Sequence, residues 1–588
     1  MNHLLFLYIE DYEDFGAISI NFSNSFEISY FDEELSVTRK NNLVHDLYGE
    51  NIIDINIIAG QNGIGKTTLL KVIADITCEK DRYSDSYNYK YIQIIRTGEE
   101  TGVIYTSLQE DRLLNVDSAN LELELEAGLT YEPGRPIVYY SPFLDFNLLE
   151  VYSEVKTQPI IDLSQTQIMM DDMEEKDRDV DEEDFVEPYS LLSHKLSNIK
   201  RHLSFVKQNR ENFILPFPLP STFWLNFHRL QAKKDDLSQQ DNEIYEELQA
   251  FCAEYFRGFP ENGISKATMA YLMFLRNLLT MFFKSVNNIK TPEILHHQLR
   301  NFSIEEVTSF ENNDPDKLIA LIVKFFQNQD VFKSNIFINL IEVVFQIINS
   351  ENVNFRNANN LLSVELDLSS QSIDRVFSIL SDAQQNSDNK QILSPLTAFI
   401  SFDWSNLSSG EKMFLDLFSR LQTLASRLTT IKEPILMMID EGEMGFHPSW
   451  QLKYVETLKV FFNTFFPLNN FQILLATHSP LVLSDFPRER AHLIRRNLET
   501  REREKLNSIG TFAQSTSELL ANEFFIETSL LGNLAKKYID DIILSIAHLV
   551  VGSVMPKDAL AIYERIALID EPIIKQLLVN ELERKANA

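Results

Sequence analysis

The sequence predicts an α/β fold built around a phosphate-binding loop, and three observations lead to this prediction. An apolar run at residues 52–59 leads into a glycine-rich segment, which is followed by the apolar spacing of a helix. A second apolar run, residues 435–439, ends in the adjacent carboxylates Asp440 and Glu441. A third run, residues 473–476, ends at Thr477 and His478. Open α/β sheets bind their ligands at the carboxyl ends of such strands.

The first 150 residues are predicted to consist mainly of strands and turns. Residues 91–96 and 102–106 are expected to form a hairpin. The other predicted strands are residues 4–9, 17–22, 25–30, 52–59 and 136–140.

Residues 60–68 match the pattern G-x-x-x-x-G-K-[S/T]. Glycines let backbone N–H groups approach a phosphate without an intervening Cβ, and the helix N-terminus adds partial positive charge. We expect Lys66 to contact the β- and γ-phosphates of ATP and the Thr67 hydroxyl to ligate Mg²⁺. The alternative, a glycine-rich turn without function, is disfavoured by the flanking strand and helix. The predicted nucleotide-binding residues are Gly60, Gln61, Asn62, Gly63, Ile64, Gly65, Lys66, Thr67 and Thr68.

The middle of the chain changes character twice. Residues 171–187 hold eleven acids and two bases, which predicts a solvated loop. From residue 189 to about 355 the pattern is helical, and residues 267–283, 318–326 and 336–348 are apolar on more than one face. Strand character returns at residues 363–368 and 398–402. A seven-residue spacing, with polar residues between, favours a short helical hairpin over a long coiled coil at Leu230, Leu237, Ile244 and Phe251.

Three further motifs lie between residues 407 and 480. Asp440 is expected to hold Mg²⁺, directly or through water, and Glu441 to orient and polarise an attacking water. Residues 407–411, Leu-Ser-Ser-Gly-Glu, resemble a helix start, with an amphipathic helix from Lys412. His478 follows the next strand, and a histidine there is more often structural than catalytic. The helix between, beginning at Pro448, is expected to have an apolar face of Trp450, Tyr454, Leu458, Phe461 and Phe465.

Composition and charge exclude several classes of protein. The chain carries 53 basic and 86 acidic residues, a net charge of −33, which does not favour general binding to DNA or anionic membranes. Two cysteines, Cys78 and Cys252, do not suffice for a zinc site or a disulfide framework. The N-terminus lacks a targeting pattern, and residues 542–555 are too few to span a bilayer. We therefore expect a cytoplasmic protein.

The four motifs lie, in chain order, at residues 60–68, 407–411, 435–441 and 473–480. In this order they resemble the motifs of ABC-type ATPase heads of the SMC, RecF and OLD class. The resemblance covers roughly residues 1–150 and 390–510. It implies an ABC-type P-loop ATPase head formed by two lobes, with a large helical insertion and a helical C-terminal tail. The implied domains are an N-lobe with the P-loop at 1–150, an acidic loop and helical insertion at 151–390, a C-lobe at 391–510 and a helical C-terminal domain at 511–588.

The resemblance also implies a head-to-head homodimer that sandwiches two ATP molecules. Ser408 and Gly410 of one chain would face the γ-phosphate held by the P-loop of the other chain. His478 would contact the γ-phosphate that is held by the P-loop of its own chain. Residues 440–448 resemble the OLD-type segment D-E-P-E-L-H-L-H-P, but Gly442 replaces the proline and Gly445 the first histidine. This departure puts the shape of the dimer-contact loop in doubt. No glutamine of the family's Q-loop follows soon after Tyr139, Tyr140, Ser141 and Pro142.

The tail at residues 511–525 is similar to that of bacterial anti-phage ATPases of the Septu kind, including retron-associated ones. This resemblance implies an ATPase that senses infection and regulates a separate HNH-type nuclease, with a reverse transcriptase and its RNA–DNA as a further partner. Neither the TOPRIM pattern nor an HNH-like histidine cluster is found, so we expect no intrinsic nuclease. Two other functions stay open: a RecF-like DNA repair or chromosome-maintenance ATPase, and a scaffold that binds ATP with very slow turnover.

Two clusters of basic residues are candidates for contact with nucleic acid, although a solvated helix face is the simpler interpretation of each. The first lies between residues 488 and 505 and is interrupted by glutamates. The second is free of acids and contains Lys195, Lys200, Arg201, Lys207 and Arg210.

Overall fold

The structure is a computed structural model. It describes residues 3–11, 17–40, 47–61, 63–77, 90–106, 108, 115–118, 121–126, 136–144, 160–174, 189–209, 216–218, 220–228, 274, 342, 344–349, 354–358, 361–368, 400–404, 407–496, 503–506, 510–516, 518–519, 532–549 and 556–587. Asn62, the heptad positions from Leu230 to Phe251, residues 318–326 and nearly all of 267–283 lie outside these residues.

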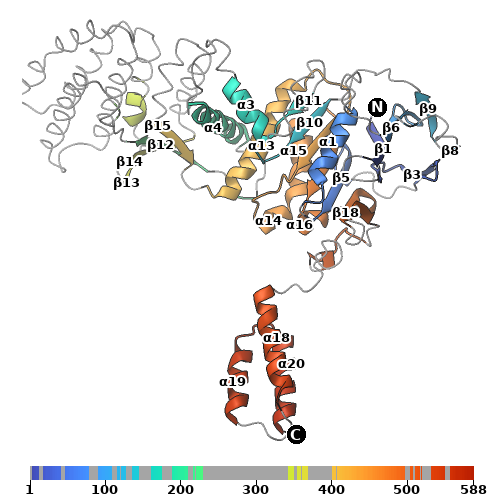
Figure 1. Ribbon diagram of the computed structural model, residues 1–588. Helices are drawn as coiled ribbons and strands as arrows, with labels where there is room; N and C mark the ends of the chain where they lie inside the picture. Colours follow the sequence, from blue (N-terminus) through green and yellow to red (C-terminus); the bar gives the residue numbers. More distant parts are fainter. Residues whose placement is uncertain are drawn as a thin grey trace, which may run out of the picture.

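A seven-stranded sheet forms the centre of the molecule (Figure 1). Its first six strands are parallel, and the last pairs antiparallel with its neighbour. This arrangement confirms the predicted α/β class and brings the ends of the three apolar runs to one edge. In spatial order the strands are β11 (Ile160–Asp162), β10 (Ile137–Tyr140), β16 (Ile435–Asp440), β17 (Phe471–Thr477), β5 (Ile52–Gly60), β18 (Ala491–Arg496) and β19 (Arg503–Leu506).

Both faces of the central sheet are buried, because alternate residues of each strand join different apolar clusters. Ile435, Met437 and Ile439 of β16 pack with helices α4 (Tyr189–Asn209), α13 (Ser409–Arg427) and α15 (Tyr454–Phe465). Leu436 and Met438 face the opposite cluster, which contains helix α1 (Lys66–Thr77) and the N-terminal strands. The functional edge of the sheet is therefore held from two sides.

The N-terminal strands form a second, five-stranded sheet that covers α1 and shares its apolar cluster. The predicted hairpin is confirmed, since β6 and β7 pair antiparallel. A three-stranded sheet packs on the other face of these strands. The five-stranded order is β2 (Ile18–Asn21), β1 (His3–Asp11), β6 (Lys90–Arg96), β7 (Thr101–Thr106) and β9 (Glu122–Glu126), and the third sheet contains β3 (Phe26–Phe31), β4 (Glu34–Arg39) and β8 (Asn115–Ser118).

The start of the acidic segment is helical, which corrects the expected loop at this point. Helix α3 (Gln165–Glu174) includes Asp171 and Asp172. The Asp172 carboxylate accepts two hydrogen bonds from the Arg201 guanidinium on α4, at 3.0 and 2.7 Å, and contacts His194 at 2.7 Å. The Arg201 guanidinium on another helix compensates the charge of the acid, which a solvated loop would not require.

An antiparallel four-stranded sheet confirms the strand character predicted near residues 363–368 and 398–402, and it also contains residues 222–228, where a helix was expected. Phe223 and Leu225 are buried on one face, and Phe223 stacks on Phe402 and meets Trp404 edge-on. Aromatic residues at alternate positions favour a strand, a preference that the surrounding helical composition obscured. The strands, in spatial order, are β13 (Asn354–Ala358), β14 (Leu361–Asp367), β12 (Thr222–His228) and β15 (Ile400–Trp404).

The C-terminal part contains three helices with an apolar cluster of their own: α18 (Asn533–Ala547), α19 (Pro556–Ala567) and α20 (Pro572–Asn587) (Figure 1). Ile542, Ile546, Ile566 and Leu582 are buried in this cluster. Within the described residues, no helix is both long enough and apolar enough to cross a membrane.

Candidate active site at the carboxyl edge of the sheet

The phosphate-binding loop connects β5 to α1. Gly63 and Gly65 adopt φ of +75° and +95°, and a Cβ built on Gly63 would meet open space. Such left-handed glycines allow successive backbone N–H groups to surround an anion. A Cβ at Gly60 would lie 2.3 Å from the Ile494 carbonyl oxygen of β18, so glycine is needed there for packing. Asn62 lies outside the described residues.

The Lys66 ammonium lies under this loop and is 6% exposed. It donates hydrogen bonds to the carbonyl oxygens of Gly60, at 3.1 Å, and Gln61, at 3.3 Å. It also lies 3.3 Å from Glu441 Oε1. The structure therefore places Lys66, the predicted phosphate-binding residue, against Glu441, the predicted catalytic carboxylate. Without nucleotide, the Glu441 carboxylate pairs with the lysine charge that would otherwise pair with a phosphate.

Thr67 and Asp440, the two predicted Mg²⁺ ligands, meet directly although they come from α1 and β16. The Thr67 hydroxyl donates to Asp440 Oδ2 at 2.7 Å. The other oxygen, Oδ1, is buried without a hydrogen-bond partner among the described residues. Burial raises the pKa of Asp440 to about 6, while the hydrogen bond from Thr67 opposes the shift. A hydroxyl beside a buried carboxylate fits a hard divalent cation such as Mg²⁺.

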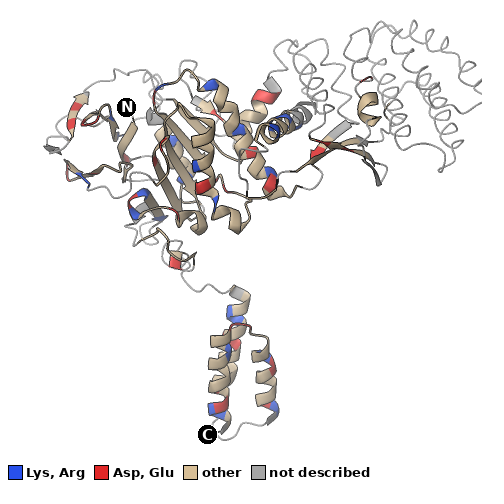
Figure 2. Ribbon diagram, turned by 180° about the vertical axis from the view of Figure 1, so that it is seen from behind, with Lys and Arg blue, Asp and Glu red and all other residues tan. Residues whose placement is uncertain are grey.

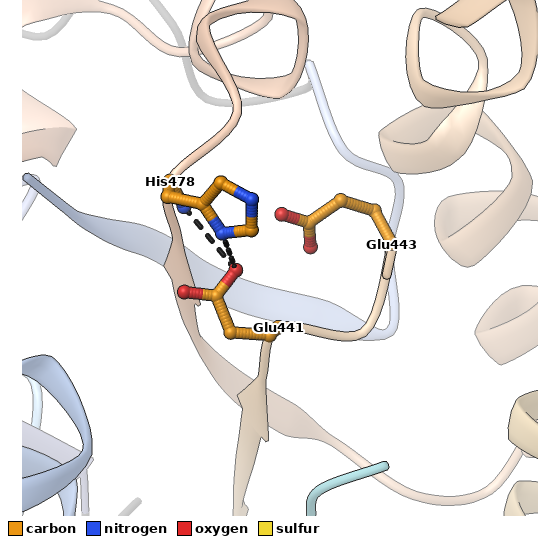
Figure 3. Close-up of side chains that lie close together, drawn as sticks. All are labelled: Glu441, Glu443 and His478. Atoms are coloured by element: carbon orange, nitrogen blue, oxygen red, sulfur yellow. Dashed lines mark hydrogen bonds and ion pairs between the residues drawn. The ribbon is translucent and has the colours of Figure 1, made fainter. Parts of the chain in front are cut away.

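Glu441 lies between Lys66 and His478. Its contact with His478 is drawn in Figure 3. Its φ of +49° is unusual for a residue with a Cβ, and such strain is concentrated at functional sites. The carboxylate oxygen Oε2 accepts hydrogen bonds from His478 Nδ1 and from the His478 backbone N–H at 3.3 Å. Burial alone would favour the neutral acid, but His478 and Lys66 outweigh it and lower the pKa of Glu441. Glu441 is thus ionised at neutral pH, as a water-orienting base must be.

His478 is half-exposed, with 48% of its side chain accessible. Its hydrogen bond to Glu441 raises the pKa of the ring, and burial opposes this only in part. Because Nδ1 is directed to Glu441, Nε2 is the ring atom that could reach a γ-phosphate. The structure thus brings together Lys66, Thr67, Asp440, Glu441 and His478.

The predicted signature turn lies at the start of α13, and among the described residues its side chains make no hydrogen bond to the P-loop. Helix α13 begins at Ser409, earlier than the expected Lys412, and Ser408 is its N-cap. Ser408 Oγ accepts from the Glu411 N–H at 3.3 Å, and Glu411 Oε2 accepts from the Ser408 N–H at 2.7 Å, which completes a capping box. A Cβ on Gly410 would lie 2.5 Å from the Gly445 carbonyl oxygen. Gly410 thus has a packing role within the chain, whatever its role toward a second one.

The structure also explains why Gly442 and Gly445 depart from the OLD-type segment. A Cβ on Gly442 would lie 2.2 Å from the Tyr454 hydroxyl oxygen and 2.6 Å from Ile439 Cγ2. Gly445 has φ +77°, and its Cβ would lie 2.4 Å from Met413 Sδ. Tyr454 and Met413 fill the space that larger side chains would need. The turn is therefore adapted to its surroundings.

We expect Gly442→Ala to destabilise the chain by about 1–3 kcal/mol through overpacking. Tyr454→Phe alone should cost little, because the Tyr454 hydroxyl is buried without a hydrogen-bond partner among the described residues. Combining the two changes should restore part of the stability, since the contact at 2.2 Å with the hydroxyl oxygen is removed while those with Ile439 Cγ2 and the ring carbon Cζ remain. Thermal unfolding of the full chain tests this, with Tyr454→Phe alone as the control for loss of the hydroxyl. Equal unfolding temperatures for Gly442→Ala and wild type would contradict the packing argument.

Sequence reasoning missed Glu443, which is 2% exposed and comes from the turn after β16. Its Oε1 accepts a hydrogen bond from the Thr477 hydroxyl. Ligand atoms of Glu441, Glu443 and His478 all lie within 4.8 Å of one another (Figure 3). The only indication in the sequence was a third acid two positions after Glu441, and such acids are usually solvated.

Gln165 also escaped the sequence analysis, which looked for a glutamine directly after β10. Its backbone N–H donates to the Ser141 carbonyl oxygen at 2.9 Å, so the start of α3 lies beside the end of β10. Its side-chain oxygen accepts from Arg420, a residue of α13 that is 1% exposed. A long intervening segment concealed this proximity.

Some residues of the two basic clusters are engaged inside the protein. Arg490 is 6% exposed, lies 3.9 Å from the Asp54 carboxylate and covers the ring of Tyr48. Arg201 binds Asp172, as described above. Arg210 lies outside the described residues. These two arginines stabilise packing, which weakens both clusters as nucleic-acid surfaces.

The fold and the site define an α/β domain with a phosphate-binding loop at the carboxyl edge of a parallel sheet. Comparisons with known proteins agree with it. Residues 287–484 match the model of a family described as "AAA domain, putative AbiEii toxin, Type IV TA system". This span includes the signature turn, Asp440, Glu441 and His478, and it begins after the P-loop. Residues 287–484 are thus similar to an AAA-type ATPase domain.

A relative and a solved structure give narrower likenesses. The "Retron Vc95 probable ATPase" of Vibrio cholerae serotype O1 biovar El Tor is 34% identical over 132 residues, which are 21% of this chain and 23% of that protein. The chain thus spans about a quarter of the relative's length. A structure titled "Structure of the recombination mediator protein RecF-ATPrS in RecFOR pathway" is 9% identical, with a TM-score of 0.23 over 86% of this chain and 98% of that one. This TM-score is below the level at which two chains share a fold.

Proposed function

We propose that this protein binds ATP with Mg²⁺ and hydrolyses it. The observation that carries the proposal is the convergence of Lys66, Thr67, Asp440, Glu441 and His478 at one edge of the sheet. An incoming phosphate competes with Glu441 for Lys66, and a Glu441 released in this way can orient a water for attack. Mg²⁺ held by Thr67 and Asp440 would neutralise charge on the β- and γ-phosphates.

The active form, in this proposal, is a head-to-head homodimer that closes on two ATP molecules. Ser408 is exposed at the start of α13, and Gly410 is half-buried beside it. The helix N-terminus there is suited to an anion, so the γ-phosphate of a second chain is a fitting partner. Nucleotide-dependent dimer formation by Glu441→Gln, measured by light scattering, tests this step, and a monomer at saturating ATP would refute it.

We further propose that the ATPase senses infection and regulates a partner effector nuclease in anti-phage defence. Support comes from the 34% sequence identity, over 132 residues, with the "Retron Vc95 probable ATPase" of Vibrio cholerae. The resemblance of the tail to Septu-type ATPases supports it as well. The expected partners are an HNH-type nuclease subunit and, in a retron setting, a reverse transcriptase with its RNA–DNA.

A RecF-like repair or chromosome-maintenance ATPase is the alternative function. It needs a basic surface that accepts DNA, yet Arg490 and Arg201 are committed to internal contacts. Basic and acidic residues are also interspersed along the described helices (Figure 2). These observations favour the defence proposal, and stimulation of ATP hydrolysis by DNA alone would reverse this preference.

The deciding experiment expresses the tagged chain from its native genomic neighbourhood. Mass spectrometry and a nucleic-acid stain identify what co-purifies, and phage plating is compared between wild type and Glu441→Gln. A co-purified nuclease together with altered plating supports the defence proposal. A chain that purifies alone and leaves plating unchanged refutes it, and ATP hydrolysis measured on the same preparation then decides whether the ATPase proposal stands by itself.

A further inference from the structure

A chain of hydrogen bonds surrounds the backbone of His478 without involving its ring. The Thr477 hydroxyl donates to Glu443 Oε1 and accepts from the Ser479 backbone N–H at 2.9 Å. The Ser479 hydroxyl donates to Gln451 Oε1 at 2.7 Å, and Gln451 Nε2 donates to the Phe446 carbonyl oxygen at 3.1 Å. Both neighbours of His478 are thus tied to the segment that follows β16.

Thr477, Glu443 and Ser479 are buried and Gln451 is partly buried, whereas the His478 ring is half-exposed. Thr477 is 0% exposed, Glu443 2% and Ser479 5%. A buried carboxyl group is costly, and an apolar side chain would fill the space at lower cost. Burial, and then the charge of Glu441, raise the pKa of Glu443 to about 7. The free-energy cost of burying the Glu443 carboxyl group indicates a functional role, and its hydrogen bond with Thr477 indicates what that role is.

We propose that Glu443 and Gln451 are positioning residues that hold His478 against Glu441 in the geometry needed for ATP hydrolysis. Glu443 acts through Thr477 on one side of His478, and Gln451 acts through Ser479 on the other. Neither residue touches the nucleotide in this proposal. The inference rests on the proposed function, because His478 needs a fixed position only if the site hydrolyses ATP.

Fixing His478 matters because the residue has an exposed ring on a short loop between β17 and the helix α16 (Pro480–Leu483). Its contact with Glu441 sets the position of both predicted catalytic groups. A shift of about 1 Å in such groups can cost about 100-fold in rate. Loss of the tethers should therefore lower kcat and leave KM and ATP affinity nearly unchanged, since the P-loop is untouched.

The test compares Glu443→Leu, Glu443→Gln and Thr477→Val, each measured for kcat, KM and the Kd of Mg²⁺-ATP. Glu443→Leu and Thr477→Val should lower kcat about 10- to 100-fold. Glu443→Gln should retain most of the activity, because an amide oxygen still accepts from Thr477. Thr457→Val, a buried threonine on α15 that bonds the Lys453 carbonyl oxygen at 2.7 Å, controls for loss of a buried hydroxyl. Thr477→Val nearly preserves the side-chain shape and keeps the test open if Glu443→Leu does not fold.

A double-mutant cycle with His478→Ala separates positioning from general stability. If Glu443 acts through His478, Glu443→Leu should add no further loss of kcat in the His478→Ala background. Fully additive losses, or wild-type kcat in both Glu443→Leu and Thr477→Val, would overturn the positioning role while wild-type hydrolysis keeps the proposed function. Absence of ATP hydrolysis by the wild type would overturn both.

Discussion

Glu441→Gln is expected to lower kcat for ATP hydrolysis by about 10²–10⁴-fold, the range typical for loss of a general base. The carboxamide keeps the shape of the side chain, but it does not polarise water as a carboxylate does. In the free protein Glu441 also lies 3.3 Å from Lys66. Removing its charge frees Lys66 for the phosphates, so ATP affinity should equal or exceed that of wild type.

Single-turnover hydrolysis and equilibrium binding of Mg²⁺-ATP, measured on the same preparation, test both parts of this expectation. Glu433→Gln is a suitable control, because Glu433 is an exposed acid just before β16, at the far end of the strand from the site. Hydrolysis by Glu441→Gln at the wild-type rate would show that another group orients the water. A large loss of affinity would mean that the variant disturbs the P-loop instead.

Lys66→Ala should have the opposite profile, with weak binding as the primary defect. A hydrogen bond to a charged group contributes about 1.5–3 kcal/mol, which corresponds to a Kd for ATP roughly 10- to 100-fold higher. The substitution also leaves Glu441, which is 7% exposed, with His478 as its remaining cationic partner among the described contacts. The variant should therefore also be less stable than wild type in the absence of nucleotide.

Isothermal titration with Mg²⁺-ATP measures the affinity, and thermal unfolding measures the stability. Lys71→Ala serves as the control, because Lys71 lies further along the same helix and belongs to no predicted phosphate contact. Wild-type affinity in Lys66→Ala would remove the lysine from the nucleotide site. Together, the Glu441 and Lys66 variants separate hydrolysis from binding, which also decides between an ATPase and an ATP-binding scaffold.

Local sequence patterns were sufficient for the elements that carry the candidate site. The apolar runs before Gly60, Asp440 and Thr477 are strands of one parallel sheet, as predicted. They could be predicted because each strand is buried on both faces, and a strand buried on both faces has a nearly continuous apolar sequence. The roles of Ser408 and Gly410 toward a second chain stay predictions, since they depend on that chain.

The predictions for residues 222–228 and for the start of the acidic segment were wrong because packing between distant parts of the chain determines their structure. Residues of β12 form a strand because Phe223 packs on Phe402 and Trp404, and Asp172 lies in a helix because the Arg201 guanidinium compensates its charge. Neither partner is near in sequence. Gly442 departs from the OLD-type segment because Tyr454 occupies the space that a larger side chain would need.

The α/β class, the phosphate-binding loop and the carboxylates after β16 follow from the amino-acid sequence alone, because they depend on patterns within a few residues. The contacts of Thr67 with Asp440, of Lys66 and His478 with Glu441, and of Glu443 with Thr477 could be seen only in the folded chain. These contacts join separate strands and helices. Their distances depend on how the sheet and its covering helices pack, which no local pattern records.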